Sequence, residues 1–371
     1  MKKLLLSAFI MALTITTVYS GLSFTNGLTH YTSAASVSVN DSLAFVPNSD
    51  VVVLVDINKF LGTKLFNSLL NNQKSRKEFQ EFEEKAAIYG FNMRQIQSVA
   101  VGVNLNQQKA DDSKFCAVVT GGFDREKILS SIAASPDKVT IESEEYQGRT
   151  VYLLTDKEKQ ANKLAASSGV KGAKIDEKIA VTFLNSQTLS IGTLDRVKDS
   201  IDVQNGKQVS VTSNQQMNNY INTTSTTAIF RFAAIIPEKQ KSATSGNKSV
   251  GAKAAANDDS PFGNPEKLLE AVQSAYGSVD FATGVQLETT ALIRSESEAK
   301  QISDALNGLL FLGRSALQGD PKQTSLAKML DGVVISGGLK DVRLNVNIPE
   351  ALLNEVIKSV TEKQASPSAK K

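Results

Sequence analysis

The sequence has almost none of the residues from which most catalytic and metal sites are built. Histidine occurs once, as His30, cysteine occurs once, as Cys116, and tryptophan does not occur. We expect His30 to be removed with the N-terminal segment 1–34 or to lie in a loose N-terminal tail, so the mature fold lacks the usual general base near neutral pH and the commonest metal ligand. This argues against Ser-His-Asp and Cys-His sites and against zinc or iron–sulfur centres. The sequence therefore identifies no catalytic residue, no cofactor site and no metal site.

Residues 1–34 have the pattern of an export signal. Lys2 and Lys3 precede the apolar run LLLSAFIMALTITTVYSGLSF, as the charged region of a signal peptide precedes its apolar region. Cleavage after Ala34 or after Ser20 fits the sequence. An uncleaved membrane anchor is the alternative, since ~20 apolar residues suffice to span a bilayer. We expect cleavage, because Ser, Thr and Gly dilute the run, and hence a periplasmic or extracellular protein with no membrane span after signal removal.

The charges of the mature chain nearly cancel. The full chain has 41 basic and 38 acidic residues, and removal of Lys2 and Lys3 leaves a net charge of +1. This balance provides no field for nucleic acid, so we expect no nucleic-acid partner. Cys116 alone cannot form an internal disulfide, so the stability of the fold must come from packing.

Hydrophobic periodicity and turn residues divide the mature chain into helices and strands. In the first half they predict strand 50–56, helix 57–89, strands 98–105 and 114–122, and helix 123–135 with Asp124 as its N-cap. Next come hairpin 138–155 around Gln147-Gly148, hairpin 178–193 and helix 194–203. In the second half they predict strand 225–236, helix 264–277, strand pair 279–295, helix 295–319, hairpin 332–348 and helix 349–360. Both halves share much of one order, which resembles the split β-α-β, ferredoxin-like unit. The expected fold class is α+β, with two ferredoxin-like repeats whose antiparallel sheets are covered by helices on one face.

Two helices of the second half carry clear start signals. Asn264 is a suitable N-cap with Pro265 at the first helical position, and Gly277 marks the expected end of that helix. Helix 295–319 begins with the capping box Ser295…Glu298.

Composition sets the expected domain boundaries. We expect a signal peptide over 1–34, a first α+β unit over 35–210, a second over 211–362 and a disordered tail over 363–371. The insertions 156–178 and 238–264 are rich in Lys, Ser, Gly and Ala, which indicates flexible loops. The alternative, a Lys-rich clamp for an anionic partner, is opposed by the acidic residues that both insertions contain.

The apolar run from Val51 to Val55 ends at a carboxylate, Asp56. In haloacid-dehalogenase-like phosphatases such a strand ends in D-x-D-x-T, but this chain has Asn58 and Phe60 at the second Asp and the Thr. A Walker B role would need a G-x-x-x-x-G-K-[ST] loop, which the chain lacks. We therefore expect Asp56 or Asn58 to cap the following helix, an interaction worth about 1 kcal/mol over alanine.

Other candidate motifs are incomplete. Gly121-Gly122 could cradle a phosphate, but a tight turn between strand and helix is the stronger interpretation. Ser325 and Lys328 have the S-x-x-K spacing of serine β-lactamases without the accompanying K-T-G.

Three further features have ordinary structural explanations. Cys116 lies in an apolar strand and is expected to be buried. The acidic pairs Asp111-Asp112 and Asp258-Asp259 lack the spacing of a calcium loop. An apolar stripe could bind lipid or a partner, although packing against a sheet is the commoner reason for one; its residues are Leu306, Leu309, Leu310, Leu312 and Leu317.

The phrase LAFVPNSDVVVLVDINKFL resembles the start of uncharacterised exported bacterial proteins, in which a signal peptide precedes a Pro-x-x-Asp-apolar strand and a Leu-rich helix. The matching residues are Pro47, Asp50, Val55 and Asp56. The resemblance implies export but no activity. We expect a non-catalytic binding, scaffolding or inhibitory protein, whose partner is another envelope or extracellular protein. The alternatives are a hydrolase or isomerase that uses carboxylate, Ser or Lys groups, and a carrier of an apolar ligand.

Overall fold

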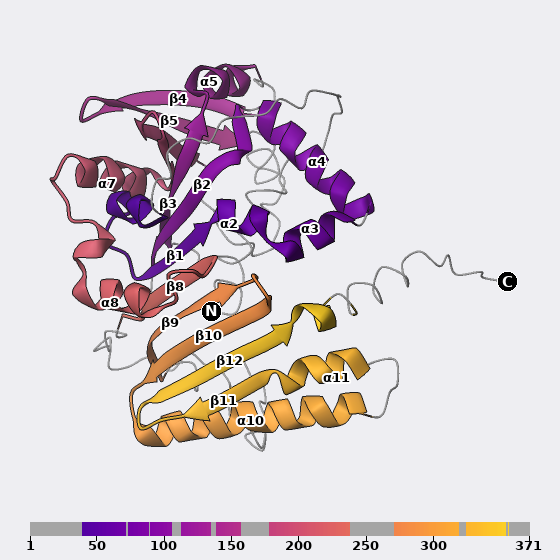
Figure 1. Ribbon diagram of the computed structural model, residues 1–371. Coiled ribbons are helices and arrows are strands. Elements are labelled where there is room, and N and C mark those ends of the chain that lie inside the picture. Colours follow the sequence, from indigo (N-terminus) through magenta and orange to yellow (C-terminus); the bar gives the residue numbers. More distant parts are fainter. Residues whose placement is uncertain are drawn as a thin grey trace, which may run out of the picture. The chain divides into compact units, whose positions relative to one another are not determined.

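The computed structural model describes residues 39–71, 73–88, 90–105, 113–134, 139–156, 178–237, 271–318, 324–353 and 355. The described chain is a mixture of helices and antiparallel strands, and it divides into two compact units after Phe232 (Figure 1). The expectations for the export signal, His30, the two acidic pairs, the interiors of both insertions and the tail lie outside the described residues.

The first unit contains eight strands or parts of strands and most of the short helices. Its elements are η1 (Val39–Phe45), β1 (Val51–Asp56), α2 (Ile57–Gly62), α3 (Lys64–Asn71), α4 (Gln73–Ile88), β2 (Phe91–Asn104), β3 (Lys114–Phe123), α5 (Arg125–Ala133), β4 (Val139–Tyr146), β5 (Arg149–Asp156), β6 (Lys178–Asn185), β7 (Thr188–Gly192), α7 (Leu194–Gln204), η3 (Val211–Ser213), α8 (Gln215–Thr223) and the start of β8 (Phe230–Ile235). The strand order from β1 onward is β1-β2-β3-β7-β6-β5-β4.

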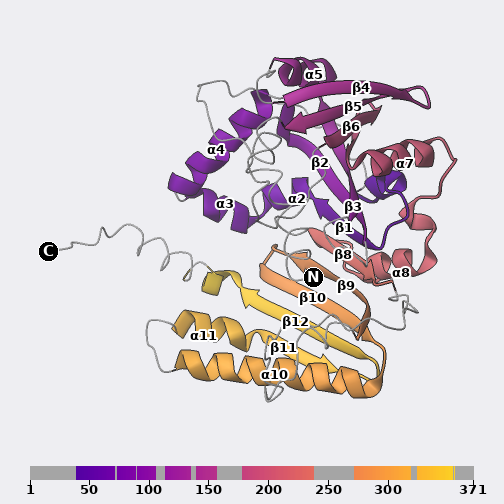
Figure 2. The ribbon, with the colours of Figure 1, turned by 180° about the vertical axis from the view of Figure 1, so that it is seen from behind.

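The sheet of the first unit is buried on both faces. Neighbouring residues of a strand point to opposite faces, and in β6 Val181 belongs to one apolar cluster and Ala180 to another. Ile128 of α5 packs in the first cluster, and Val197 of α7 packs in the second. Figures 1 and 2 show α7 and the α3–α4 pair on opposite sides of β2 and β3. The prediction that helices cover only one face of the sheet is therefore wrong for this unit. Its strands are continuous apolar runs, which need a covering layer on each face.

Turn and cap residues determine several boundaries as the sequence predicts. Gln147 and Gly148 both have positive φ, 50° and 75°, as a two-residue type I′ hairpin turn requires. They join β4 to β5 in register from Val139 opposite Asp156 to Tyr146 opposite Arg149. The Asp124 carboxylate accepts from the Lys127 amide at 2.9 Å and caps α5.

The second unit contains the end of β8, β9 (Val272–Asp280), β10 (Gly284–Ile293), α10 (Glu296–Gln318), α11 (Thr324–Asp331), β11 (Val333–Gly337) and β12 (Asp341–Pro349). Its strand order is β11-β12-β10-β9. The predicted capping box is confirmed: Ser295 Oγ accepts from the Glu298 amide at 3.2 Å and donates to the Glu298 carboxylate at 2.9 Å.

The helix expected over 264–277 is wrong in its described part, because residues 272–277 belong to β9. This strand pairs with β10 from Val272 opposite Ile293 to Asp280 opposite Gln286. Ser274 and Ser278 are buried on it, so small polar residues occupy positions where strand periodicity would show apolar ones. The spacing of the remaining apolar residues therefore favours a helix, but pairing with β10 overrides this local preference.

Two ferredoxin-like repeats are not confirmed. In the first unit the strands before and after the α2–α4 segment pair directly, with Val51 opposite Val103 and Asp56 opposite Ser98, so no strand separates them. In the second unit β12 pairs with both β10 and β11 and separates them, which is a split arrangement. The order of element types was similar in the two halves, but strand order depends on distant pairings that this order does not specify.

Candidate functional site

Asp56, the carboxylate at the end of β1, is a helix cap. Its Oδ1 accepts from the Lys59 amide at 2.9 Å, and Lys59 Nζ lies 3.6 Å from Oδ2. The side chain is buried, and its charge also acts on Arg231, where burial lowers the pKa of the guanidinium and Asp56 opposes that shift. The prediction that Asp56 is a cap is confirmed.

Gly121 and Gly122 lie within β3 rather than in a turn after it. A Cβ at Gly121 would lie 2.5 Å from the carbonyl oxygen of Gln95, where the pairing of β2 with β3 is irregular. The predicted turn is therefore wrong, and the glycine is explained by the close approach of the β2 backbone.

Ser325 and Lys328 lie on α11, but the Ser325 hydroxyl donates to Glu355 at 3.3 Å and Lys328 is exposed. Cys116 is buried as predicted, 3.0 Å from Ser200 Oγ and 3.3 Å from Ser190 Oγ. Burial raises the pKa of the Cys116 thiol, and the two serine hydrogen bonds oppose the shift only in part. A buried, protonated thiol is a packing residue rather than a nucleophile.

A candidate surface of the second unit lies on α10, where the polar side chain of Arg314 reaches the sheet. Asn307 is exposed, and its Nδ2 donates to the Ser303 carbonyl of the same helix at 3.0 Å and lies 3.5 Å from the Ile335 carbonyl. Arg314 Nη2 donates to the carbonyls of Val333 at 3.2 Å and Leu330 at 2.8 Å. Val333 and Ile335 belong to β11, the strand at the end of this unit's order. The helix thus satisfies carbonyls along a sheet edge that would otherwise be open to pairing.

The same helix also exposes large apolar side chains. The exposed fractions are 53% for Leu309, 68% for Phe311 and 50% for Leu312. The core packing expected for the apolar stripe is wrong for Leu306, Leu309 and Leu312, which are exposed, while Leu310 and Leu317 are half-buried. The packed part of α10 is its first half, where Ala299 contacts the cluster around Ile293 and Val342.

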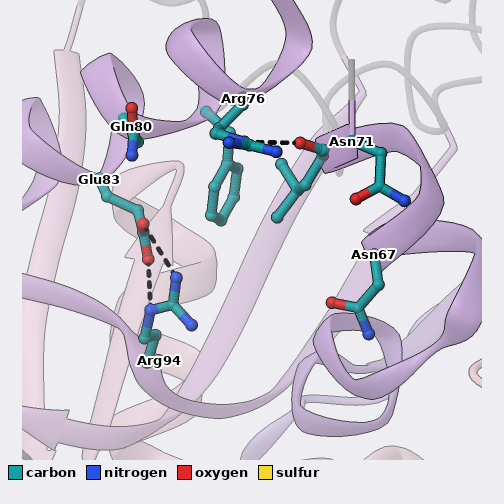
Figure 3. Close-up of a pocket in the computed structure, with 8 residues that line it drawn as sticks. Asn67, Asn71, Arg76, Gln80, Glu83 and Arg94 are labelled. Atoms are coloured by element: carbon teal, nitrogen blue, oxygen red, sulfur yellow. Dashed lines mark hydrogen bonds and ion pairs between the residues drawn. The ribbon is translucent and has the colours of Figure 1, made fainter. Parts of the chain in front are cut away.

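A second candidate site, in the first unit, is an open pocket of about 380 Å³ lined by α3, α4 and the start of β2. Its lining residues are Asn67, Leu70, Asn71, Arg76, Phe79, Gln80, Glu83 and Arg94. Figure 3 shows Asn67 and Asn71 on one side of the opening and the Glu83–Arg94 pair on the other. Phe79 packs edge-on to Phe66, with ring centroids 5.0 Å apart, which holds α4 against α3.

The charged groups of this pocket are not equivalent. Arg94 binds Glu83 through two contacts, Nε to Oε1 at 2.8 Å and Nη2 to Oε2 at 3.2 Å. The Nε of Arg76 donates to the Leu70 carbonyl at 2.8 Å, and Arg76 pairs with no carboxylate in the described part of the chain. The pocket therefore carries one positive charge beside a neutralised ion pair.

The sequence did not reveal the polar residues of α10 near β11, nor the pocket that contains Arg76 and Arg94. Asn307 and Arg314 are seven residues apart in an otherwise apolar stretch, and a spacing of seven puts both on one face of a helix. That spacing was the available signal for polar side chains on the side of α10 near β11. No local pattern connects Arg94 to Arg76, because α4 and the irregular start of β2 meet only in the folded chain.

No protein-family model matches the chain, and no curated protein sequence matches it. One solved structure, crystal form I of TP0453, aligns with 86% of this chain and 96% of its own at 9% identity, with a TM-score of 0.37. Similarity of this degree supports no inference about fold or function. Of the helices in the described ranges, none has the length and hydropathy needed to cross a membrane. The described residues also contain no group of three His, Cys, Asp or Glu side chains placed to hold a metal ion.

Proposed function

We propose that the chain is an exported binding protein, and that it binds another protein through the outer surface of α10. The observation that carries the proposal is the exposure of Leu309, Phe311 and Leu312 on a helix that contacts the β11 backbone through Arg314. A helix that is apolar around much of its circumference is normally covered. A cluster of exposed large apolar side chains marks an interaction surface.

The charges of α10 favour a protein partner over a lipid surface. Helices that lie on membranes usually carry Lys and Arg beside their apolar face. The charged residues of α10 are Glu296, Glu298, Lys300, Asp304 and Arg314, so acids outnumber bases. Arg314 also faces β11 and pairs with Asp331 at 3.6 Å. The surface lacks the positive charge that would draw it to anionic lipid.

The expected occupant is an apolar face of an α-helix. Gly308, Ala305 and Ala316 lie between the large side chains of α10 in the sequence, and small residues leave grooves between ridges of Leu and Phe. Two helices pack by placing the ridges of one in the grooves of the other. An apolar contact of this kind also needs no histidine, metal or cofactor.

A photo-crosslinking experiment tests the proposal. A benzophenone analogue of phenylalanine replaces Phe311 in the exported protein, and after irradiation we expect one protein adduct of defined mass. Leu309→Ser and Leu312→Ser in the same chain should remove the adduct, whereas the probe at Gln215 of α8 should give none. Adducts to lipid alone, or a protein adduct that persists in the double variant, would contradict the proposal.

Export is part of the same proposal and has its own measurement. N-terminal sequencing of the protein from cell fractions should find a chain that begins at Ala35 or Gly21. A chain that begins at Met1 in the membrane fraction would instead indicate an uncleaved anchor.

A further inference from the structure

We propose that the pocket between α3, α4 and β2 binds a short peptide that ends in a free carboxylate. This site belongs to the first unit and does not depend on the role proposed for α10. Its volume of about 380 Å³ falls in the range of small-ligand sites.

The carboxylate is assigned to Arg76. Glu83 already neutralises Arg94 through a two-point contact, so Arg94 cannot add a second full charge to the site. Arg76 uses its Nε on the Leu70 carbonyl, which fixes the guanidinium at the rim and leaves both terminal nitrogens as donors. One guanidinium with two parallel N–H groups matches one carboxylate, and a single positive charge matches a singly charged ligand.

The three carboxamide side chains of the pocket are expected to bind the peptide group of the ligand. Asn67, Asn71 and Gln80 line it, and their side chains form no hydrogen bond to any other residue that the structure describes. A carboxamide offers both donors and an acceptor, which are the two functions that a peptide group needs from its partner. Leu70 and Phe79 supply apolar lining for one side chain of the ligand. A phosphate or nucleotide would need more than one unpaired positive charge here.

The test is a titration of the full mature chain, labelled with ¹⁵N, by N-acetyl-Gly-Leu with a free carboxylate. The side-chain amide signals of Asn67, Asn71 and Gln80 should shift and saturate. The C-terminal amide of the same dipeptide should bind about five- to tenfold more weakly, since it loses a charge-assisted contact. Sodium acetate should bind more weakly still, because it has neither a peptide group nor an apolar side chain.

Two matched variants distinguish a specific role of Arg76 from a general effect of positive charge on this helix. Arg76→Gln should abolish the preference for the free acid over the amide. Lys77→Gln removes the same charge from the neighbouring position of α4, where Lys77 faces Glu81 at 3.9 Å and does not line the pocket. It should leave the preference unchanged. The proposal is overturned if the three amide signals do not saturate, if acetate binds as tightly as the dipeptide, or if both variants behave alike.

Discussion

At the scale of single residues, the buried guanidinium of Arg196 joins two segments that are distant in the sequence. It is buried on α7 and its Nη2 donates to the Asn48 carbonyl at 2.8 Å, the Pro47 carbonyl at 3.3 Å and Ser49 Oγ at 2.8 Å. Its Nη1 donates to Asp199 at 2.8 Å. One side chain therefore connects α7 to the segment that leads into β1. The resemblance to exported proteins rests partly on Pro47, whose carbonyl is one of these acceptors.

Arg196→Met should lower the free energy of unfolding by about 2–4 kcal/mol, because buried carbonyls and Asp199 lose their donor. Urea titration at pH 7 measures the change. Arg343→Met is the matched control, since Arg343 is 62% exposed and pairs with Asp341 at the surface. Its cost should stay below about 1 kcal/mol. Equal costs for the two variants would show that the buried contacts of Arg196 contribute nothing particular.

At the scale of elements, α10 is divided along its length. Ala299 and Ile302 of the first half pack against the sheet, whereas Leu309, Phe311 and Leu312 of the second half are exposed. The edge of β11 explains the arrangement, because a side chain that hydrogen-bonds its carbonyls must carry a donor, as Arg314 does. The element thus protects a sheet edge through Arg314 and also presents exposed apolar side chains.

Leu312→Ala should change the free energy of unfolding by less than about 0.5 kcal/mol, since an exposed side chain leaves no cavity. Ile293→Ala, in the cluster on which α10 packs, should cost about 2–5 kcal/mol. Chemical unfolding of the two variants compares them directly. A cost for Leu312→Ala as large as that for Ile293→Ala would mean that Leu312 is packed within the protein, and the interaction surface would then lose its support.

Considered as a whole molecule, the chain has separate cores in its two units. Leu184, Val197 and Ile201 lie in a cluster of the first unit, and Ile293 and Val342 lie in a cluster of the second. Each unit is therefore expected to have a stability of its own.

Leu184→Ala should test this separation, because it removes a fully buried side chain from the first unit alone. Native-state hydrogen exchange should show loss of protection by about 2–5 kcal/mol in β5, β6 and β7. Protection in β10 and β12 should be unchanged. An equal loss in both sets of strands would show that the two units unfold as one.

The local parts of this protein could be predicted from its sequence. The capping box at Ser295, the cap at Asp56, the turn at Gln147-Gly148 and the burial of Cys116 all follow from nearby residues and from backbone geometry. The helix expected through Gly277 failed because β9 takes its conformation from pairing with β10. The expected repeats failed because strand order is a property of distant contacts.

The element types of most segments and the α+β class follow from local residue patterns, and the scarcity of histidine and cysteine is a property of the composition. Folding brings Arg314 to the edge of β11 while Leu309 and Leu312 stay exposed. Folding also places the Glu83–Arg94 pair beside Arg76, which has no carboxylate partner among the described residues. Periodicity identifies an apolar stripe, but it cannot say whether the fold brings a neighbour to cover it. Whether a charge is neutralised likewise depends on residues that are distant in the chain and meet only after folding.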